Sequence, residues 1–104
     1  MANQDDQLPT PRRFQAWQVR NPFNPSTEIR FGIPVASDVS LTVYNLLGQE
    51  VVSLVNEFKS AGNYSVQFNA AHLSSGMYLY RLSVSTPSGN AKGFTHVKKL
   101  LLLR

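Results

Sequence analysis

Apolar and polar residues alternate with a period of two over much of the chain. In the segment 28–33 (EIRFGI), Ile29, Phe31 and Ile33 alternate with polar residues or glycine. This period is typical of a β-strand that buries one face, because successive side chains of a strand point to opposite sides. Pro34 ends the segment, since proline has no backbone N–H to donate to a sheet.

The next two segments predict a β-hairpin. In residues 38–45 (DVSLTVYN) every second residue is apolar, namely Val39, Leu41 and Val43. Residues 50–55 (EVVSLV) are the expected partner strand. The connection, LLGQ, has the length of a tight turn, and we expect Gly48 to adopt the positive φ that such a turn requires.

Further strands are expected before and after this hairpin. They are FQAWQV (14–19), YSVQF (64–68), MYLYRLSVS (77–85) and GFTHVKKLLLL (93–103). The segment 70–76 is too short and too rich in serine and glycine for a stable helix, and we expect one 3₁₀-like turn there. About seven strands without helical periodicity predict an all-β fold, an antiparallel immunoglobulin-like β-sandwich. A small barrel is the alternative fold.

The composition allows one domain with one modest core, at 104 residues and 42% hydrophobic residues. We place a polar, proline-containing linker at 1–13 and the domain at 14–104. The longest apolar run, Leu100–Leu103, is far shorter than the ~18–20 residues of a membrane span. The first residues lack the hydrophobic segment of a signal peptide. We therefore expect either a protein that stays where it is made or a piece of a longer exported chain.

Charge divides the chain into two unequal halves. Residues 1–57 hold six acids and four bases, a balance of −2, whereas residues 58–104 hold six bases and no acid, a balance of +6. These six bases are dispersed, and only Lys98 and Lys99 are adjacent. We interpret them as scattered solvated charge, so no nucleic-acid partner is predicted.

No group of residues has the spacing of a catalytic or metal site. The acids fall in the linker, at strand ends or in turns, and His72 and His96 lack a third ligand nearby. The absence of cysteine excludes thiolate chemistry and cysteine-based zinc sites. There is no G-x-S-x-G motif and no glycine-rich phosphate loop. We predict that the protein is not an enzyme and uses no cofactor or metal.

Aromatic residues suggest an alternative function. Trp17, Tyr44, Tyr64, Tyr78 and Tyr80 would stack on sugar rings if they shared one exposed face of the sandwich, as in a carbohydrate-binding module of a glycoside hydrolase. The competing interpretation, which we favour, is that these aromatics fill the core or pair across strands.

The motif NPFNPST precedes the first clear strand and comprises Asn21, Pro22, Phe23, Asn24, Pro25 and the two residues after them. Each proline fixes its own φ and disfavours the α region for the asparagine before it. We expect a stiff double turn that points Phe23 into the core and starts a strand at Thr27. If the ring is buried, Phe23→Ala should cost about 3–5 kcal/mol.

Three segments also resemble a known family. NPFNPSTEIRFGIP, VSLTVYNLLGQEVVSLVNEFKSAGNYSVQFNAAHLSSGMYLYRL and the terminal KKLLLLR are similar to the type A C-terminal sorting domain of type IX (Por) secretion cargo, over roughly residues 14–104. Val19-Arg20 stands where such domains usually have Tyr-Pro. The resemblance implies a fold similar to the immunoglobulin-like domain of flagellar hook-capping proteins.

The resemblance also implies partners and a location. An outer-membrane translocon would recognise the domain, and a sortase-like peptidase would cleave near the linker. The fused upstream cargo would then be released or anchored to surface lipopolysaccharide. The implied route runs through the periplasm to the cell surface or the extracellular space, so contact with the membrane surface is only indirect.

The end of the chain is the proposed recognition element for the translocon. Its residues are Lys98, Lys99, Leu100, Leu101, Leu102, Leu103 and Arg104. On an alternating strand the even-numbered leucines face one side and the odd-numbered leucines the other, so we expect one pair to remain accessible. We predict recognition by strand pairing and apolar contact, with the lysines opposing self-association. The alternative is that all four leucines pack between the sheets.

Overall fold

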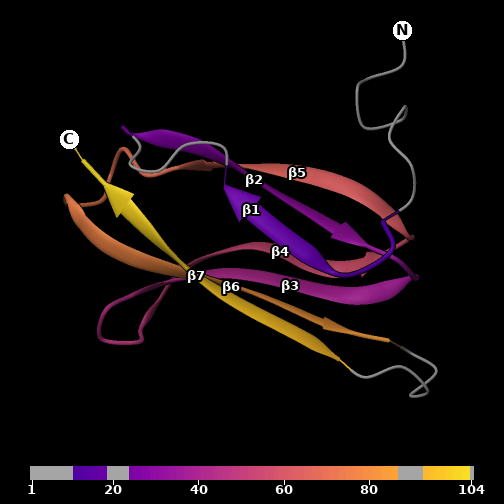
Figure 1. The fold of residues 1–104 in the computed structure, drawn as a ribbon. Helices are drawn as coiled ribbons and strands as arrows, with labels where there is room; N and C mark the ends of the chain where they lie inside the picture. The colour runs from indigo at the N-terminus through magenta and orange to yellow at the C-terminus, as the bar shows by residue number, and fades with distance from the viewer. Residues whose placement is uncertain (1–10, 19–23, 87–92, 104) are drawn as a thin grey trace, which may run out of the picture.

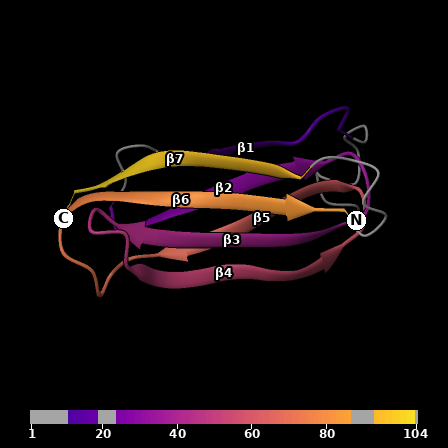
Figure 2. The same cartoon turned by 90° about the horizontal axis from the view of Figure 1, so that it is seen from below.

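The computed structural model describes residues 11–18, 24–86 and 93–103, which form two antiparallel sheets packed face to face (Figure 1). The first sheet has the order β1-β2-β5, with strands Gln15–Gln18, Ser26–Ile33 and Gly62–Asn69. The second has the order β4-β3-β6-β7, with strands Glu50–Lys59, Ser37–Asn45, Gly76–Ser85 and Phe94–Leu102. Figure 2 shows the four-stranded sheet lying over the three-stranded one. The predicted all-β sandwich of seven strands is confirmed.

The core lies between the two sheets and consists of the apolar rows that the sequence predicts. Its fully or almost fully buried members include Ile29, Phe31, Ile33, Val39, Leu41, Val43, Phe68, Tyr80, Leu82, Val84, Leu100 and Leu102. Alternation places these side chains on the inner face of each strand, while most of their polar neighbours lie on the outer face. Burial of each aliphatic or phenylalanine side chain in this core contributes about 1.5–3 kcal/mol to folding.

The hairpin of β3 and β4 is present, but β4 is longer than predicted. It continues past Val55 to Lys59, which pairs with Ser37. Strict alternation is lost along β4 because two register shifts interrupt its pairing with β3. Without this alternation, the sequence pattern does not show that the strand continues to Lys59. Gly48 has a φ of 84°, as the tight turn requires.

The connection between β5 and β6 contains the predicted single turn. The Leu73 N–H donates to the Ala70 carbonyl at 2.9 Å, a hydrogen bond between residues three apart. Such a bond closes one turn of the 3₁₀ type.

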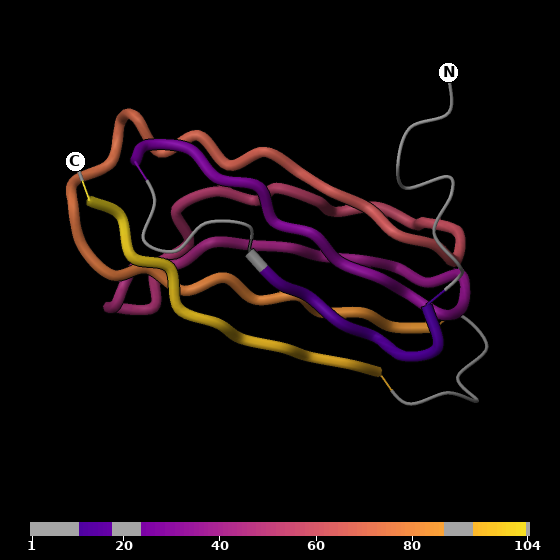
Figure 3. Tube along the Cα trace, turned by 45° about the horizontal axis from the view of Figure 1, so that its top comes forward, coloured from indigo at the N-terminus to yellow at the C-terminus, as the bar shows by residue number. Residues whose placement is uncertain are grey.

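Different segments of the chain lie at the two ends of the sandwich (Figure 3). At the end that we call the linker end, Pro11 lies against Gly32. A Cβ atom on Gly32 would come within 2.8 Å of the Pro11 ring, so only glycine allows this close approach. At the opposite end, which we call the C-terminal end, β3 finishes at Asn45 and β7 at Leu102. Strands of nine or ten residues separate the two ends by about 30 Å.

Candidate functional site

β7 is the edge strand of the four-stranded sheet. It pairs with β6 through nine consecutive residue pairs, from Phe94 with Val84 to Leu102 with Gly76, without a register shift. Among the described residues no strand pairs with its other side. Figure 2 shows β7 and β1 along the same side of the sandwich, where Phe94 stacks on Phe14 with ring centroids 5.3 Å apart. An edge strand presents a row of backbone N–H and C=O groups to any strand that docks beside it.

The four terminal leucines divide between core and surface. Leu100 and Leu102 have no exposed area, Leu101 is partly buried, and Leu103 is 49% exposed. The alternative in which all four leucines pack between the sheets is therefore wrong, because a strand in one sheet points only every second side chain at the other sheet. The terminal strand thus contributes to the core on one side and presents an apolar edge on the other.

Lys98 and Lys99 directly precede the four leucines in β7, and both side chains are exposed. Lys98 pairs with Tyr80 and Lys99 with Leu79 across β6 and β7. Because neighbouring residues of a strand point to opposite faces of the sheet, the two lysine side chains lie on opposite faces. Among the residues that the structure describes, neither forms an ion pair. Arg104 lies outside the described residues.

The other edge of the same sheet, β4, is built differently. Its pairing with β3 shifts register twice, between Leu41 and Thr42 and between Val43 and Tyr44. Such bulges twist an edge and hinder the addition of a further strand. A cleft of about 260 Å³ lies between β4 and β5, lined by Phe31, Leu54, Val55, Asn56, Glu57, Lys59, Ser65 and Val66.

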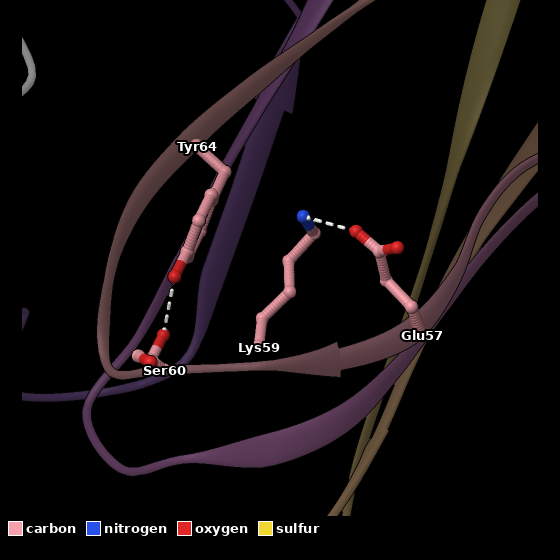
Figure 4. A network of polar contacts seen from close by, with 4 residues as sticks. All are labelled: Glu57, Lys59, Ser60 and Tyr64. Carbon is pink, nitrogen blue, oxygen red and sulfur yellow. Dashed lines mark hydrogen bonds and ion pairs between the residues drawn. The ribbon is translucent and has the colours of Figure 1, made fainter.

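Polar contacts cover one end of that cleft (Figure 4). The Lys59 ammonium lies 2.7 Å from a Glu57 carboxylate oxygen and 4.7 Å from the centroid of the Tyr64 ring. The Tyr64 hydroxyl donates to the Ser60 carbonyl at 2.6 Å. These contacts satisfy one another, so they present no unpaired charge to a ligand.

The motif before β2 is described only in part. Asn21, Pro22 and Phe23 lie outside the described residues, so the burial of Phe23 stays a prediction. The Pro25 carbonyl accepts a hydrogen bond from the Ala70 N–H at 2.9 Å, and β2 begins at Ser26. The second half of the motif is therefore attached to the connection between β5 and β6.

The aromatic residues do not share one exposed face. Tyr78 and Tyr80 point into the core, with 9% and 0% of their surface exposed, which removes them from contact with a sugar ring. Trp17 pairs with Arg30 on the outer side of the three-stranded sheet, whereas Tyr44 lies on the outer side of the other sheet, where Arg81 donates to its hydroxyl at 2.8 Å. The geometry gives these four side chains no common platform.

The Tyr80 hydroxyl is a buried polar atom without a hydrogen-bond partner among the described residues. Burial disfavours the phenolate and raises the pKa of Tyr80 to about 12. Tyr78 differs, because its hydroxyl donates to the Ser74 carbonyl at 2.7 Å. A neutral, enclosed phenol of this kind has no access to substrate.

Other chemistry is sparse in the described part of the chain. A second shallow groove of about 270 Å³ lies on the outer face of the four-stranded sheet, lined by Asp38, Val39, Ser40, Asn56, Glu57, Ser83 and Ser85. Within residues 11–18, 24–86 and 93–103, no three histidine or acidic side chains gather as metal ligands. The same residues contain no helix long and apolar enough to cross a membrane.

One surface feature does not follow from the sequence pattern. Leu46 and Leu47, in the turn between β3 and β4, are 66% and 85% exposed. The sequence predicts the turn and the conformation of Gly48, but the alternation rule assigns no face to residues outside a strand. The available signal is the position of two leucines between a turn-forming Asn and a Gly.

A crystal structure is similar to this chain in fold. Dimeric latent PorU from Porphyromonas gingivalis aligns with a TM-score of 0.66 and 18% identity, over 85% of this chain and 9% of the PorU chain. At that identity the likeness concerns the fold alone. A search of curated proteins finds no match.

A family model provides the assignment. The model described as "secretion system C-terminal sorting domain" matches residues 21–100, which span β2 to most of β7. The match includes both the motif before β2 and the exposed lysines of the edge strand. The chain therefore belongs to the family of secretion system C-terminal sorting domains, with a role in type IX secretion and export toward the cell surface or the extracellular space.

Proposed function

We propose that this chain is the non-catalytic sorting and anchoring module of a longer exported protein, and that β7 is the strand the outer-membrane translocon recognises. The observation that carries this proposal is the outer side of β7, which is regular, pairs with no strand among the described residues, and ends in an apolar segment. A regular edge suits β-strand addition, in which backbone hydrogen bonds supply affinity and side-chain contacts supply specificity.

The side chains of β7 fit the two requirements of such a recognition strand. Leu103 is half exposed and offers apolar contact to a docking strand. Lys98 and Lys99 place positive charge beside this contact, which opposes pairing between two copies of the same edge. A partner with acidic side chains there would not experience that repulsion.

The positions of Pro11 and of the end of β7 support recognition by two partners at separate sites. Pro11 lies at the linker end and Leu103 at the C-terminal end, about 30 Å away along the strands. A cargo domain fused upstream of the linker would therefore leave the last residues of β7 accessible in the periplasm. A sortase-like peptidase would cleave near the linker without competing for these residues, and the cargo would remain at the cell surface.

Deletion of Lys98–Arg104 from a secreted reporter fused to this domain tests the proposal. We expect the reporter to accumulate inside the cell and its surface fraction to fall to background in a bacterium with a type IX system. Because the deletion also removes Leu100 and Leu102 from the core, circular dichroism of the purified variant must accompany the assay. Delivery of the truncated reporter at the level of the intact fusion would show that the recognition element lies elsewhere.

A further inference from the structure

The turn between β3 and β4 exposes two adjacent leucines at the C-terminal end of the sandwich. Leu46 is 66% and Leu47 is 85% exposed, more than any other large hydrophobic residue in the described part of the chain. Neither belongs to the core or to the partly buried residues packed against it. Their side chains therefore do not contribute to the packing of the sandwich.

The backbone that carries these leucines is held firmly. The Asn45 side-chain oxygen accepts from the Leu47 N–H at 2.9 Å and from the Gln49 N–H at 3.0 Å. The Asn45 side-chain amide donates to the Gln49 side-chain oxygen at 2.8 Å. Two backbone bonds, from Gly48 N–H to the Asn45 carbonyl and from Asn45 N–H to the Gln49 carbonyl, are 3.0 Å each. The turn is closed by the asparagine and the glycine, and no feature of its geometry requires leucine.

A rigid display of apolar side chains is what a binding site needs, because little conformational entropy is lost when a partner covers it. Large side chains inserted into a partner's pocket also dominate the affinity of many interfaces. The turn combines both properties in the described residues.

We propose that Leu46 and Leu47 form a second recognition element, a two-leucine projection that inserts into an apolar socket on the same protein partner that pairs with β7. The inference rests on the proposed sorting function. The turn and the end of β7 are separated only by β6, since Tyr44 pairs with Leu79 and Leu79 with Lys99. Two strand spacings amount to about 10 Å, so one partner surface can reach both.

Charge around the projection indicates the chemistry of the socket. Arg81 stacks over the Tyr44 ring at 5.1 Å from its centroid, and Lys99 lies on the same outer face of the sheet. Glu50, which pairs with Tyr44, is the acid beside them. The complementary surface is an apolar socket bordered by acidic side chains.

A membrane is the less suitable occupant. Two leucine side chains carry about eight carbon atoms, fewer than a myristoyl chain, which alone gives only marginal membrane binding. A shaped protein socket obtains much more from the same two side chains, because it also excludes water around them.

The test measures how much of a fused reporter reaches the cell surface when the domain carries Leu46→Ser/Leu47→Ser. The matched control is the same fusion with Val35→Ser. Val35 is 44% exposed and lies between β2 and β3 at the linker end. We expect the double variant to lower the surface fraction about tenfold or more and the control to leave it unchanged, with unaltered circular dichroism in both. Leu46→Met/Leu47→Met should retain delivery, because it keeps the apolar surface.

The outcomes separate this inference from the proposed function. If deletion of Lys98–Arg104 blocks delivery and Leu46→Ser/Leu47→Ser does not, the projection has no such role, while the sorting function stands. If the methionine variant fails like the serine variant, apolar contact is not what the partner requires. Leucine-dependent binding of the purified domain to phosphatidylglycerol–phosphatidylcholine vesicles, or leucine-dependent dimerisation in sedimentation velocity, would assign the leucines to a membrane or to a second copy and overturn the proposal.

Discussion

The two outer edges of the four-stranded sheet differ in how readily they would accept another strand. β4 shifts register twice against β3, whereas β7 keeps nine consecutive pairs with β6. Bulges are a common way to prevent edge-to-edge association. One sheet therefore combines a blocked edge with a regular one, and the regular edge is the one that a partner strand can extend.

The regular edge is still protected against its own copies. Lys98 and Lys99 are exposed and have no ion-pair partner among the described residues, so two β7 edges would bring like charges together. On β4, by contrast, Lys59 is paired with Glu57. The two edges use different devices, backbone irregularity on β4 and side-chain charge on β7.

The largest expected effect concerns the inner and outer leucines of β7. Leu100→Ala should lower the free energy of unfolding by about 2–5 kcal/mol, because it empties a fully buried position. Leu103→Ala should change it by less than about 0.5 kcal/mol, as is usual for surface positions. Urea unfolding measures both. A large loss for Leu103→Ala would mean that the outer leucine is structural and that the apolar edge is not free for a partner.

A smaller effect, dependent on pH, is expected at Tyr80, which pairs with Lys98 on β7. Its pKa is about 12 in the folded protein against 10.0 for the ordinary phenol. Above pH ~10 the unfolded chain loses this proton while the folded chain keeps it, so the free energy of unfolding falls as the pH rises toward 12.

Tyr80→Phe removes the unpaired hydroxyl and, with it, the fall in the free energy of unfolding at high pH. We expect the variant to gain about 1 kcal/mol at pH 7 and a further 2–3 kcal/mol, roughly, relative to the parent as the pH approaches 12. Urea unfolding of both proteins at several pH values gives the difference directly. A difference that does not grow with pH would show that water reaches the hydroxyl beneath β7.

The smallest changes in stability are expected at the lysines of the two edges. Lys98→Ser/Lys99→Ser should hardly alter the free energy of unfolding, but it should promote association through β7. Lys59→Ser should cost less than about 1 kcal/mol, since its ion pair with Glu57 is partly solvated, and should leave the domain monomeric. Sedimentation velocity at matched concentrations distinguishes the two. Equal association of both variants would remove the distinction between the edges.

Much of the fold follows from local alternation in the sequence. The rows of β2, β3 and β6 and the division of the terminal leucines are all consequences of a two-residue period, which depends only on backbone geometry. The sheet order β4-β3-β6-β7 is not local, because it depends on which distant segments pair. The sequence pattern therefore predicts a terminal strand but does not show that it lies at an edge.

Two parts of the candidate site required the structure for a further reason. The bulges of β4 break the alternation among Val51, Val52, Leu54 and Val55, all of which end partly buried. The exposure of Leu46 and Leu47 depends on the hydrogen bonds of Asn45, which hold both residues in a turn outside the pairing of β3 with β4. Irregular backbone of this kind has no period for a sequence pattern to reveal.

Proline substitution tests most directly whether the β7 edge is recognised. In an antiparallel pair, neighbouring residues alternately direct their N–H toward and away from the partner strand. One of His96→Pro and Val97→Pro should therefore keep the pairing with β6 and fold. The same holds for Asn56→Pro and Glu57→Pro on β4, which serve as the matched control. In the reporter fusion, we expect that the folded β7 variant is not delivered to the surface, while the folded β4 variant is delivered normally. Normal delivery of the folded β7 variant would contradict this expectation.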